Sequence, residues 1–443
     1  MAHKNLLLTL ALGVFAGALD LGVLSPALPA LGLQFEVPTG ALAWVFTIYL
    51  LVNVASIAIA STLADRYGRR VVYMSCVALF AIGSMVAIAA PSFGILLLAR
   101  ALQALGAGGI FPVATAAIGD VVPQERRGAA LGMVAATWGL AAIIGPTFGG
   151  LVTHFASWRW IFVLNLPLAF AVLVLAQRYV PNNAPKARGP LDGFGLLLLC
   201  AGLLLVMDGL TTERWIVVVV GIAILAGFIF WERNAYTPIV PPSLFSTPQL
   251  AKTYLLELAI GALEGSLFFI PAVLVGAQQI SYLAAGLVAA LGALMFVIVI
   301  PLSGRALDRI GSRDVLLIGA VFTEAGLGLF AIGFASMPLA LLAIVIAGCG
   351  FGALLGAPTR YIVTNETDGR TRATALGLLS QALIAGQILG GSLAGGLIGA
   401  TTNELHGYRN AYLAFSGIAL LALIICATLD SRRQERSEPQ VSS

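Results

Sequence analysis

The sequence predicts an all-α membrane protein that crosses a bilayer fourteen times. Of its 443 residues, 59% are hydrophobic and only 10% are charged, whereas soluble domains average about 25% charged residues. Its 20 prolines and 50 glycines fall mostly within apolar runs, and membrane helices tolerate both residues there. So few charges cannot cover a surface that faces water, so most of the chain must face lipid or its own core.

The spans follow from length, because about 20 apolar residues cross the hydrocarbon core as a helix. Six runs come first, at 8–33, 41–63, 71–91, 94–118, 129–153 and 160–178. Two more lie at 193–210 and 215–231, and a further six at 251–276, 282–304, 314–333, 337–358, 373–400 and 410–429. The first run is too long for a signal peptide and contains Asp20, so we expect a retained helix.

The loops that carry lysine and arginine predict the orientation. With the N-terminus inside, twenty of the 24 basic residues fall in cytoplasmic segments, Arg100 lies within a span, and only Arg159, Arg214 and Arg409 lie outside. Cytoplasmic loops of membrane proteins carry such an excess. We therefore expect a multi-pass protein of the cell membrane, such as a bacterial inner membrane, with both termini in the cytoplasm.

The chain also repeats itself. Four residues of the loop after the second span recur 243 positions later: Asp65, Arg66, Gly68 and Arg70 become Asp308, Arg309, Gly311 and Arg313. The repeat predicts two six-helix bundles, at 1–180 and 251–430. Residues 181–250 then form a linker with two inserted helices, and 431–443 form a cytoplasmic tail. Internal repeats are typical of secondary transporters, whose sites lie near the midplane between the halves.

Six motifs follow one another along the chain. The first three are Leu19 and Asp20 before Ala27, Leu28 and Pro29; STLADRYGRR at 61–70; and Arg100 with Gln103, Gly106 and Gly108. The other three are Gly139, Gly145, Pro146, Gly149 and Gly150; Trp158 to Phe162 with Asn165 and Pro167; and Trp231 to Arg233 with Leu244 and Phe245. They resemble the major facilitator superfamily, in particular its fourteen-span drug:proton antiporter branch, although Ser61 and Ala104 replace usual glycines. The resemblance implies the major facilitator fold, two six-helix bundles plus two inserted helices, and proton-coupled export of small molecules.

The loop motif and its repeat have an implied role as a conformational gate. The residues concerned are Asp65, Arg66, Gly68, Arg69 and Arg70, with Asp308, Arg309 and Gly311 in the second copy. A carboxylate near a helix N-terminus is stabilised by the helix dipole, and that contact would break as the halves move. The alternative is a basic cytoplasmic loop with a capping aspartate. In either case these residues are expected not to touch substrate.

The glycine series of the fifth span is the implied antiporter motif. Its members are Gly139, Gly145, Pro146, Gly149 and Gly150. Glycines let helices approach closely, and a proline removes a backbone hydrogen bond and kinks a helix. Such a span could seal the outward path, or it could be an ordinary close-packed helix. The second half has Gly390 and Gly391 at this place without the proline.

Arg100 and Asp20 are charges within apolar runs. A charge there costs at least a few kcal/mol unless it is paired or hydrated, so we expect Asp20 to be the partner of Arg100; the alternative is that Arg100 extends to the interface. Burial favours the neutral form of a carboxyl, whereas a neighbouring guanidinium favours the charged form. This competition suits Asp20 to proton coupling or to binding a substrate cation.

Glu257 and Glu264 are the corresponding acids of the second half. Seven residues are close to two helical turns, so both carboxyls fall on one face, about 10.5 Å apart along the axis. We interpret them as a proton relay or a seat for a cationic substrate, while Glu257 could instead lie at the cytoplasmic end of its helix. Glu324 lies at membrane depth in a peripheral helix, where a structural pair is equally plausible.

Several classes of function are disfavoured. No phosphate-binding loop ending in Lys-Ser/Thr occurs, so ATP is not expected as a partner, and no cofactor, metal site or nucleic-acid patch is indicated. We therefore expect a proton-coupled exporter, not an enzyme, whose substrates are amphiphilic and neutral or cationic. The alternatives are an exporter of one metabolite or lipid and, less favoured, a membrane sensor or scaffold.

Overall fold

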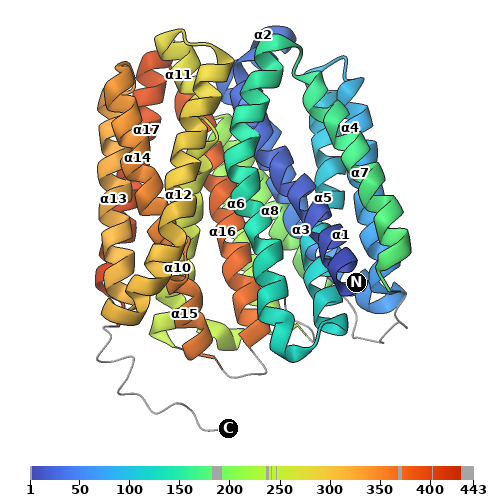
Figure 1. Ribbon diagram of the computed structural model, residues 1–443. Helices are drawn as coiled ribbons and strands as arrows, with labels where there is room; N and C mark the ends of the chain where they lie inside the picture. The colour runs from blue at the N-terminus through green and yellow to red at the C-terminus, as the bar shows by residue number, and fades with distance from the viewer. Residues whose placement is uncertain are drawn as a thin grey trace. The chain divides into compact units, whose positions relative to one another are not determined.

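The computed structural model describes residues 2–181, 192–235, 239–240, 242–245, 247–367, 372–401 and 403–430. All regular secondary structure in these ranges is helical (Figure 1). Fourteen helices or helix pairs are long and apolar enough to cross a membrane. The predicted fold class and number of spans are therefore confirmed.

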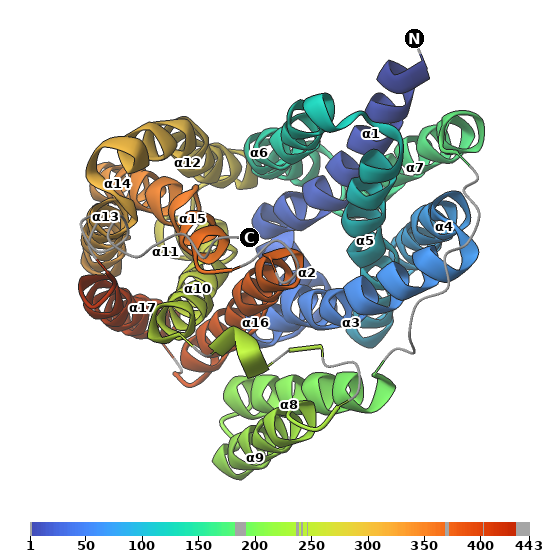
Figure 2. The same ribbon diagram turned by 90° about the horizontal axis from the view of Figure 1, so that it is seen from below.

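The first seven numbered helices run from α1 to α7, with two short 3-10 turns between them. Their bounds are α1 Ala2–Leu24, α2 Leu28–Phe35, α3 Trp44–Tyr67, α4 Arg69–Ile88, α5 Phe93–Val121, α6 Gln124–Phe155 and α7 Arg159–Tyr179. The inserted pair is α8 Gly193–Thr211 and α9 Trp215–Glu232. These two helices lie side by side (Figure 2), and their contact lies at Gly202 and Gly221, where neither helix has a side chain.

Eight more helices complete the chain. They are α10 Pro248–Leu267, α11 Ile270–Gln278, α12 Tyr282–Ile310, α13 Ser312–Gly333, α14 Met337–Leu354, α15 Pro358–Asn365, α16 Arg372–Gly399 and α17 Glu404–Ala427. Three spans are each made of two helices: α1 with α2, α10 with α11, and α14 with α15. The sequence predicts the first two as single runs, and its run at 337–358 ends where α15 begins.

Prolines mark these three breaks. Pro26, Pro271 and Pro358 each lie in the first two positions of the helical segment that follows the break. A proline is tolerated at a helix start, where its missing N–H would have no partner, but it disrupts a helix interior. Pro26 and Pro271 are 245 positions apart, so the internal repeat extends to the break in the first helix of each half.

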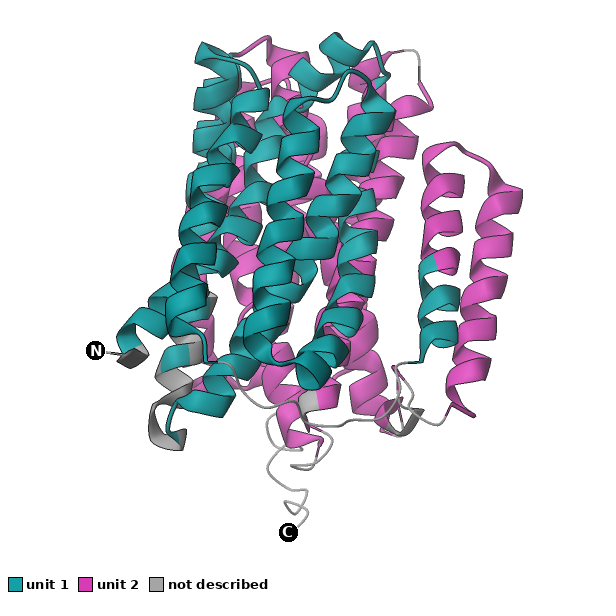
Figure 3. Ribbon diagram, turned by 90° about the vertical axis from the view of Figure 1, so that its right-hand side faces the viewer, with its two compact units in different colours: residues 1–38, 44–200, 281–290 teal, residues 39–43, 201–280, 291–443 magenta. Residues whose placement is uncertain are grey.

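The chain divides into two compact units (Figure 3). Unit 1 comprises residues 1–38, 44–200 and 281–290, and unit 2 comprises residues 39–43, 201–280 and 291–443. Most of α1 to α7 belongs to unit 1, and most of α9 to α17 belongs to unit 2. The predicted boundaries at 1–180, 181–250 and 251–430 stay predictions, and the predicted tail at 431–443 lies outside the described residues.

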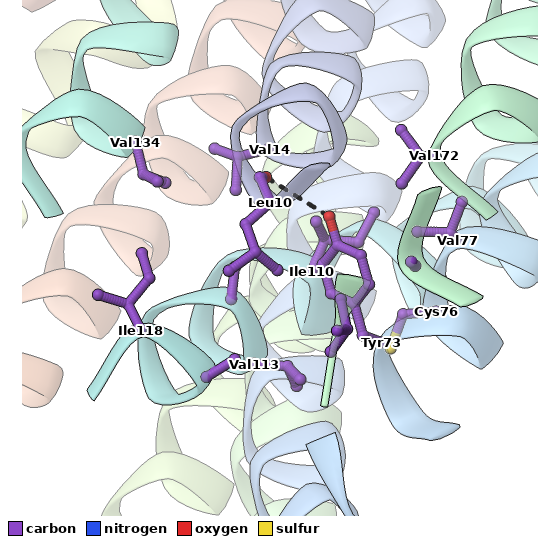
Figure 4. Close-up of a cluster of buried hydrophobic side chains, with 14 of the residues drawn as sticks. Leu10, Val14, Tyr73, Cys76, Val77, Ile110, Val113, Ile118, Val134 and Val172 are labelled. Atoms are coloured by element: carbon purple, nitrogen blue, oxygen red, sulfur yellow. Dashed lines mark hydrogen bonds between the residues drawn. The ribbon is translucent and has the colours of Figure 1, made fainter. Parts of the chain in front are cut away.

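Helix pairing follows the same plan inside each unit. In unit 1, α4 packs against α5 and α7, while α1 packs against α6 and α7. In unit 2, α13 packs against α14 and α17, while α10 packs against α16 and α17. In the core of unit 1, the Tyr73 hydroxyl donates to the backbone oxygen of Leu10 at 3.4 Å (Figure 4). The backbone oxygen of Thr9 lies 3.2 Å from the same hydroxyl.

Glycines set the closest helix approaches in both units. A β-carbon on Gly145 of α6 would lie 3.1 Å from the Cα of Gly22 on α1. In unit 2, a β-carbon on Gly265 of α10 would lie 2.9 Å from the nitrogen of Gly391 on α16. Because no side chain separates the backbones, α1 with α6 and α10 with α16 form two equivalent close crossings.

Each unit also takes in one short segment that is distant in sequence. Residues 39–43 pack on α16 in unit 2, where the Thr39 hydroxyl donates to Glu404 Oε1 at 2.8 Å. Residues 281–290 belong to unit 1, where Gly150 of α6 would bring a β-carbon within 3.1 Å of the Leu283 Cα. The two segments are about 243 positions apart and thus correspond in the repeat.

Candidate functional site

Asp20 of α1 is the centre of a buried polar cluster in unit 1. Only 1% of its surface is exposed. Its carboxylate is paired with Arg100 Nη1 and accepts hydrogen bonds from Gln103 Nε2 at 3.2 Å and Asn165 Nδ2 at 2.8 Å. The three donors come from α5 and α7. The cation and the two amides satisfy the hydrogen-bonding capacity of the buried carboxylate.

Arg100 of α5 is fully buried, so it does not extend to the interface. Its Nε donates to the Val45 oxygen at 3.2 Å, and Nη1 also donates to Gln103 Oε1 at 2.8 Å. The guanidinium carbon lies 4.2 Å from the centre of the Tyr49 ring, within cation–π range. The predicted pairing of Arg100 with Asp20 is confirmed, and Nη2 lacks a partner among the described residues.

Ser84 of α4 closes the cluster. Its hydroxyl oxygen accepts from Gln103 Nε2 at 2.8 Å and from Asn165 Nδ2 at 3.4 Å, and it donates to the Phe80 carbonyl at 3.0 Å. The same two amides therefore bind both Asp20 and Ser84. We call these side chains, Asp20, Ser84, Arg100, Gln103 and Asn165, the Asp20 cluster. Its one negative and one positive charge cancel, so the cluster is neutral as a whole.

Glu257 of α10 has a different environment in unit 2. It is 5% exposed, and the Thr359 hydroxyl of α15 donates a hydrogen bond to its carboxyl group. Arg360, the residue after Thr359, forms no ion pair with Glu257 among the residues that the structure describes. Within the described part of the chain, Glu257 Oε2 is buried without any hydrogen-bond partner. A buried acceptor in this state is costly.

Glu264 lies two turns further along α10. Its Oε2 accepts a hydrogen bond from Gln387 Nε2 of α16 at 2.9 Å. The neighbouring residue Gly265 forms the close crossing with α16, which brings Gln387 within reach. Glu264 follows Asp20 by 244 positions, so the two acids occupy corresponding places in the repeat. Glu264 has one amide partner where Asp20 has two amides and a guanidinium.

Glu324 of α13 is also at membrane depth. Its Oε1 accepts a hydrogen bond from the Ser416 hydroxyl of α17 at 3.1 Å. This contact gives the carboxyl a partner within its own helix pair. It matches the structural alternative that the sequence leaves open.

The first predicted gate lies at the turn from α3 to α4. Asp65 is in the last turn of α3 and pairs with Arg69 of α4 at 2.6 Å, while Arg69 Nε bonds Asp120 of α5 at 3.2 Å. Arg70 donates to the backbone oxygen of Gln177 on α7. In this structure the motif therefore ties α3, α4, α5 and α7 together at one end of unit 1.

The second copy of this turn has the same backbone. Gly68 has φ 95° and Gly311 has φ 93°, and each is the N-cap of the following helix. Both glycine nitrogens donate to the residue four positions earlier, Ala64 or Leu307. Asp308 and Arg309 lie exposed in the last turn of α12. The repeat thus preserves a conformation that residues with a β-carbon rarely adopt.

The predicted antiporter glycines lie on one long helix. α6 continues through Pro146, and Gly139 is half-buried on it. Gly145 and Gly149 approach α1 at Gly22 and Val23, while Pro146 and Gly150 approach the start of α12.

Sequence reasoning alone missed several partners of the site. Tyr49, Gln387 and Thr359 each contact a predicted site residue, Ser84 contacts the motif residue Gln103, and Asp120 binds Arg69. The available signal was a polar side chain inside an apolar run. That signal is weak for serine, threonine and tyrosine, which membrane helices accommodate readily.

Comparison with known proteins places this geometry in a family. A family model described as Major Facilitator Superfamily matches residues 10–276 and 254–443. The uncharacterized MFS-type transporter YfiU of Bacillus subtilis (strain 168) is 31% identical over 97% of this chain and 86% of its own length. The multidrug resistance protein B homolog of Mycobacterium tuberculosis (strain ATCC 25618 / H37Rv) is 29% identical over 75% of this chain and 65% of its own length.

Solved structures show the same fold at low sequence identity. A D-xylose-proton symporter aligns with a TM-score of 0.74 and 15% identity, over 98% of this chain and 99% of the other. The nucleoside transporter NupG aligns with a TM-score of 0.69 and 16% identity, over 98% of this chain and all of the other, 100%. Together with the fourteen candidate spans, these matches show that the chain is a multi-pass membrane protein and belongs to the major facilitator superfamily, a family of small-molecule transporters rather than enzymes.

Proposed function

We propose that this protein is a proton-coupled antiporter that exports lipophilic or cationic small molecules. In this proposal it lies in the bacterial inner membrane with both termini in the cytoplasm, as the distribution of basic residues indicates. Glu257 and Glu264 exchange the proton and the substrate cation, and the buried pair of Asp20 and Arg100 is a fixed centre that transport requires. The proposal rests mainly on one observation, the lack of a counter-ion at the two glutamates of α10.

The electrostatic argument begins with the difference between buried pairs and buried single charges. Asp20 is neutralised by Arg100. Neither Glu257 nor Glu264 has an ion-pair partner within the described residues, although both lie in a membrane-spanning helix. An isolated carboxylate in such a place is strongly disfavoured. A bound proton or a bound cationic substrate relieves this cost.

Proton and substrate cation would then compete for the same carboxyls. When a proton occupies the α10 glutamates, a cation loses its electrostatic attraction to them. When a cation occupies them, protonation is disfavoured. Such mutual exclusion links proton entry to substrate exit, and this linkage is what an antiporter requires. Protonation or deprotonation of the α10 glutamates would also change the polarity of the site, and this change would release neutral lipophilic substrates.

The gate and glycine motifs have a supporting role in this proposal. Asp65 and Arg69 form a contact that can break and reform as the protein changes conformation. The close crossing of α6 at Gly145 and Gly149 is suited to a helix whose tilt changes without unpacking. Export is favoured by the names of two relatives, the multidrug resistance protein B homolog and the efflux pump dotC of Dothistroma septosporum.

The test is transport by the purified chain in proteoliposomes with an imposed pH gradient. The substrates would be a panel of organic cations, neutral drugs and lipids. We expect wild-type protein to move cations and neutral amphiphiles only when the gradient is present. A broad response across the panel supports a polyspecific exporter, whereas a response to one compound would indicate a narrow one.

The variant Glu257→Gln/Glu264→Gln replaces both α10 carboxyls by amides and so tests their role. It is expected to lose gradient-driven transport, and Asp20→Asn is also expected to lose it. Glu324→Gln is the matched control, because it removes a carboxyl at membrane depth whose recorded partner is Ser416. Undiminished gradient-driven export by the double variant would exclude the α10 glutamates as coupling groups.

A further inference from the structure

A cavity in unit 2 is lined by none of the candidate site residues described above. It is formed where α13 ends and α17 begins, and we call it the α13–α17 cavity. Its lining residues are Ala331, Ile332, Phe334, Ala335, Leu405, His406 and Arg409. Two of these can carry positive charge and the other five are apolar.

The two basic side chains have no partners of their own. In the described part of the chain, neither His406 nor Arg409 takes part in an ion pair or a side-chain hydrogen bond, and both are exposed. The guanidinium of Arg409 offers five N–H donors, and the imidazole offers at least one in either protonation state. The cavity therefore has several free donors at one place.

Acidic Glu404 lies close in sequence but on another face of α17. Its two oxygens accept from Thr39 at 2.8 Å and from the Tyr408 hydroxyl at 3.3 Å. At about 100° per residue, Glu404 and Tyr408 share one face of the helix, while Leu405, His406 and Arg409 share another. Glu404 is thus occupied elsewhere and does not neutralise the cavity.

One acceptor at the end of α13 is engaged away from the cavity. The backbone oxygen of Phe334 is already bonded to Gln278 Nε2 at 2.6 Å. On the other side, α17 begins at Glu404, so the positive end of its helix dipole is near His406. The negative end of the α13 dipole lies at the same cavity and opposes it, so the preference for an anion comes from the side chains of Arg409 and His406.

The apolar side chains of the lining indicate a ligand that has an apolar part as well as a negative charge. Ile332 is 67% exposed and Leu405 is 44% exposed, and each is at the end of a membrane-spanning helix. An apolar rim next to paired basic groups at this depth fits a molecule with an anionic head and an apolar tail. An arginine binds phosphate oxygens through charge-assisted hydrogen bonds, and the apolar side chains beside it can contact the acyl chains of the same lipid.

We propose that the α13–α17 cavity binds the phosphate headgroup of an anionic glycerophospholipid. Arg409 and His406 hold the phosphate oxygens, and Ile332 and Leu405 contact the first carbons of the acyl chains. This site is independent of the proposed antiport. It would attach one lipid of defined charge to the α13–α17 helix pair.

The test measures lipid binding to the purified full chain in detergent by native mass spectrometry. Dioctanoyl phosphatidylglycerol, dioctanoyl phosphatidylcholine and inorganic phosphate are titrated separately. Wild-type protein is expected to bind phosphatidylglycerol more tightly than either other ligand. Arg409→Gln is expected to weaken that binding about tenfold, since a charge-assisted hydrogen bond is lost, and Arg409→Lys is expected to retain part of it.

Arg214→Gln is the matched control, because it removes one exposed arginine at the start of α9, far along the chain from the cavity. It should bind phosphatidylglycerol as wild type does. Equal binding of phosphatidylglycerol by Arg409→Gln/His406→Gln and wild type would overturn the proposal. Equal affinity for phosphatidylcholine would overturn the need for an anion, and phosphate binding without a lipid preference would overturn the lipid as occupant.

Discussion

The acids of the two units occupy related places in the chain but have different surroundings. Asp20 and Glu264 are 244 positions apart, each on the first helix of its half. Asp20 is bound by a guanidinium and two amides, whereas Glu264 has one amide, and one buried oxygen of Glu257 has no partner among the described residues. The repeat conserves where an acid lies, and the neighbouring helices determine how firmly it is held.

The backbone, unlike the partners of the acids, is alike in the two units. The turns at Gly68 and Gly311 have nearly the same φ, and both units have a glycine crossing of their first and fifth helices. The two units therefore share the same backbone geometry where two helices approach each other or where the chain reverses direction. They differ in the side chains that surround a buried acid. We interpret the Asp20 cluster as a fixed structural centre and the α10 glutamates as exchangeable sites.

The largest effect on stability is expected in the Asp20 cluster. Arg100→Gln or Asp20→Asn leaves one charge of a buried pair uncompensated, and such changes cost about 3–5 kcal/mol. Unfolding of the purified protein in detergent would measure the loss. The double variant Asp20→Asn/Arg100→Gln should be more stable than either single one. If the single changes cost less than about 1 kcal/mol, the cluster is not a fixed centre.

A smaller effect is expected at the glycine crossings. A methyl group at Gly149 would meet the carbonyl oxygen of Val23, and one at Gly390 would meet that of Ala262. Because backbone atoms cannot move aside easily, each change to alanine should cost about 1–3 kcal/mol. Gly377→Ala in α16 is the control, since nothing lies within 4 Å of its added β-carbon. A similar cost in both units would show that the crossings are equivalent.

The turn glycines should give effects that are nearly equal to each other. Gly68→Ala and Gly311→Ala force a β-carbon into a backbone conformation with φ near 95° and 93°. The expected cost is about 1–2 kcal/mol each. Gly304→Ala, in α12 with open space around it, should be neutral or slightly stabilising. A large difference between the two turns would mean that only one of them is under conformational constraint.

The fold could be predicted from sequence because apolar length and the side preference of arginine are strong physical constraints in a membrane. The breaks at Pro26 and Pro271 were missed, since a length rule treats a broken span and a whole span alike, whereas the run predicted at 337–358 ends at the break at Pro358. Proline in an apolar run was the visible signal. The repeat offset of 245 between Pro26 and Pro271 would have strengthened it.

The candidate site could be predicted only in part. The sequence predicts that Asp20 pairs with Arg100, because a lone charge in an apolar run is costly. Their remaining partners depend on how each helix is rotated about its axis. Helices that are apolar all round carry little periodic signal to set that rotation. Contacts such as Gln387 with Glu264 and Thr359 with Glu257 therefore required the structure.

The smallest effect on stability is expected at Glu257. Glu257→Gln keeps a carbonyl oxygen that can accept from Thr359, and it removes no ion pair. Its buried Oε2 already lacks a partner, so little stabilisation is lost and the free energy of unfolding should change by no more than about 1 kcal/mol. Parallel unfolding of Glu257→Gln and Asp20→Asn tests the contrast directly. Were both to lose stability equally, Glu257 would be a structural group like Asp20, because a site that exchanges protons must tolerate its carboxyl in the neutral form.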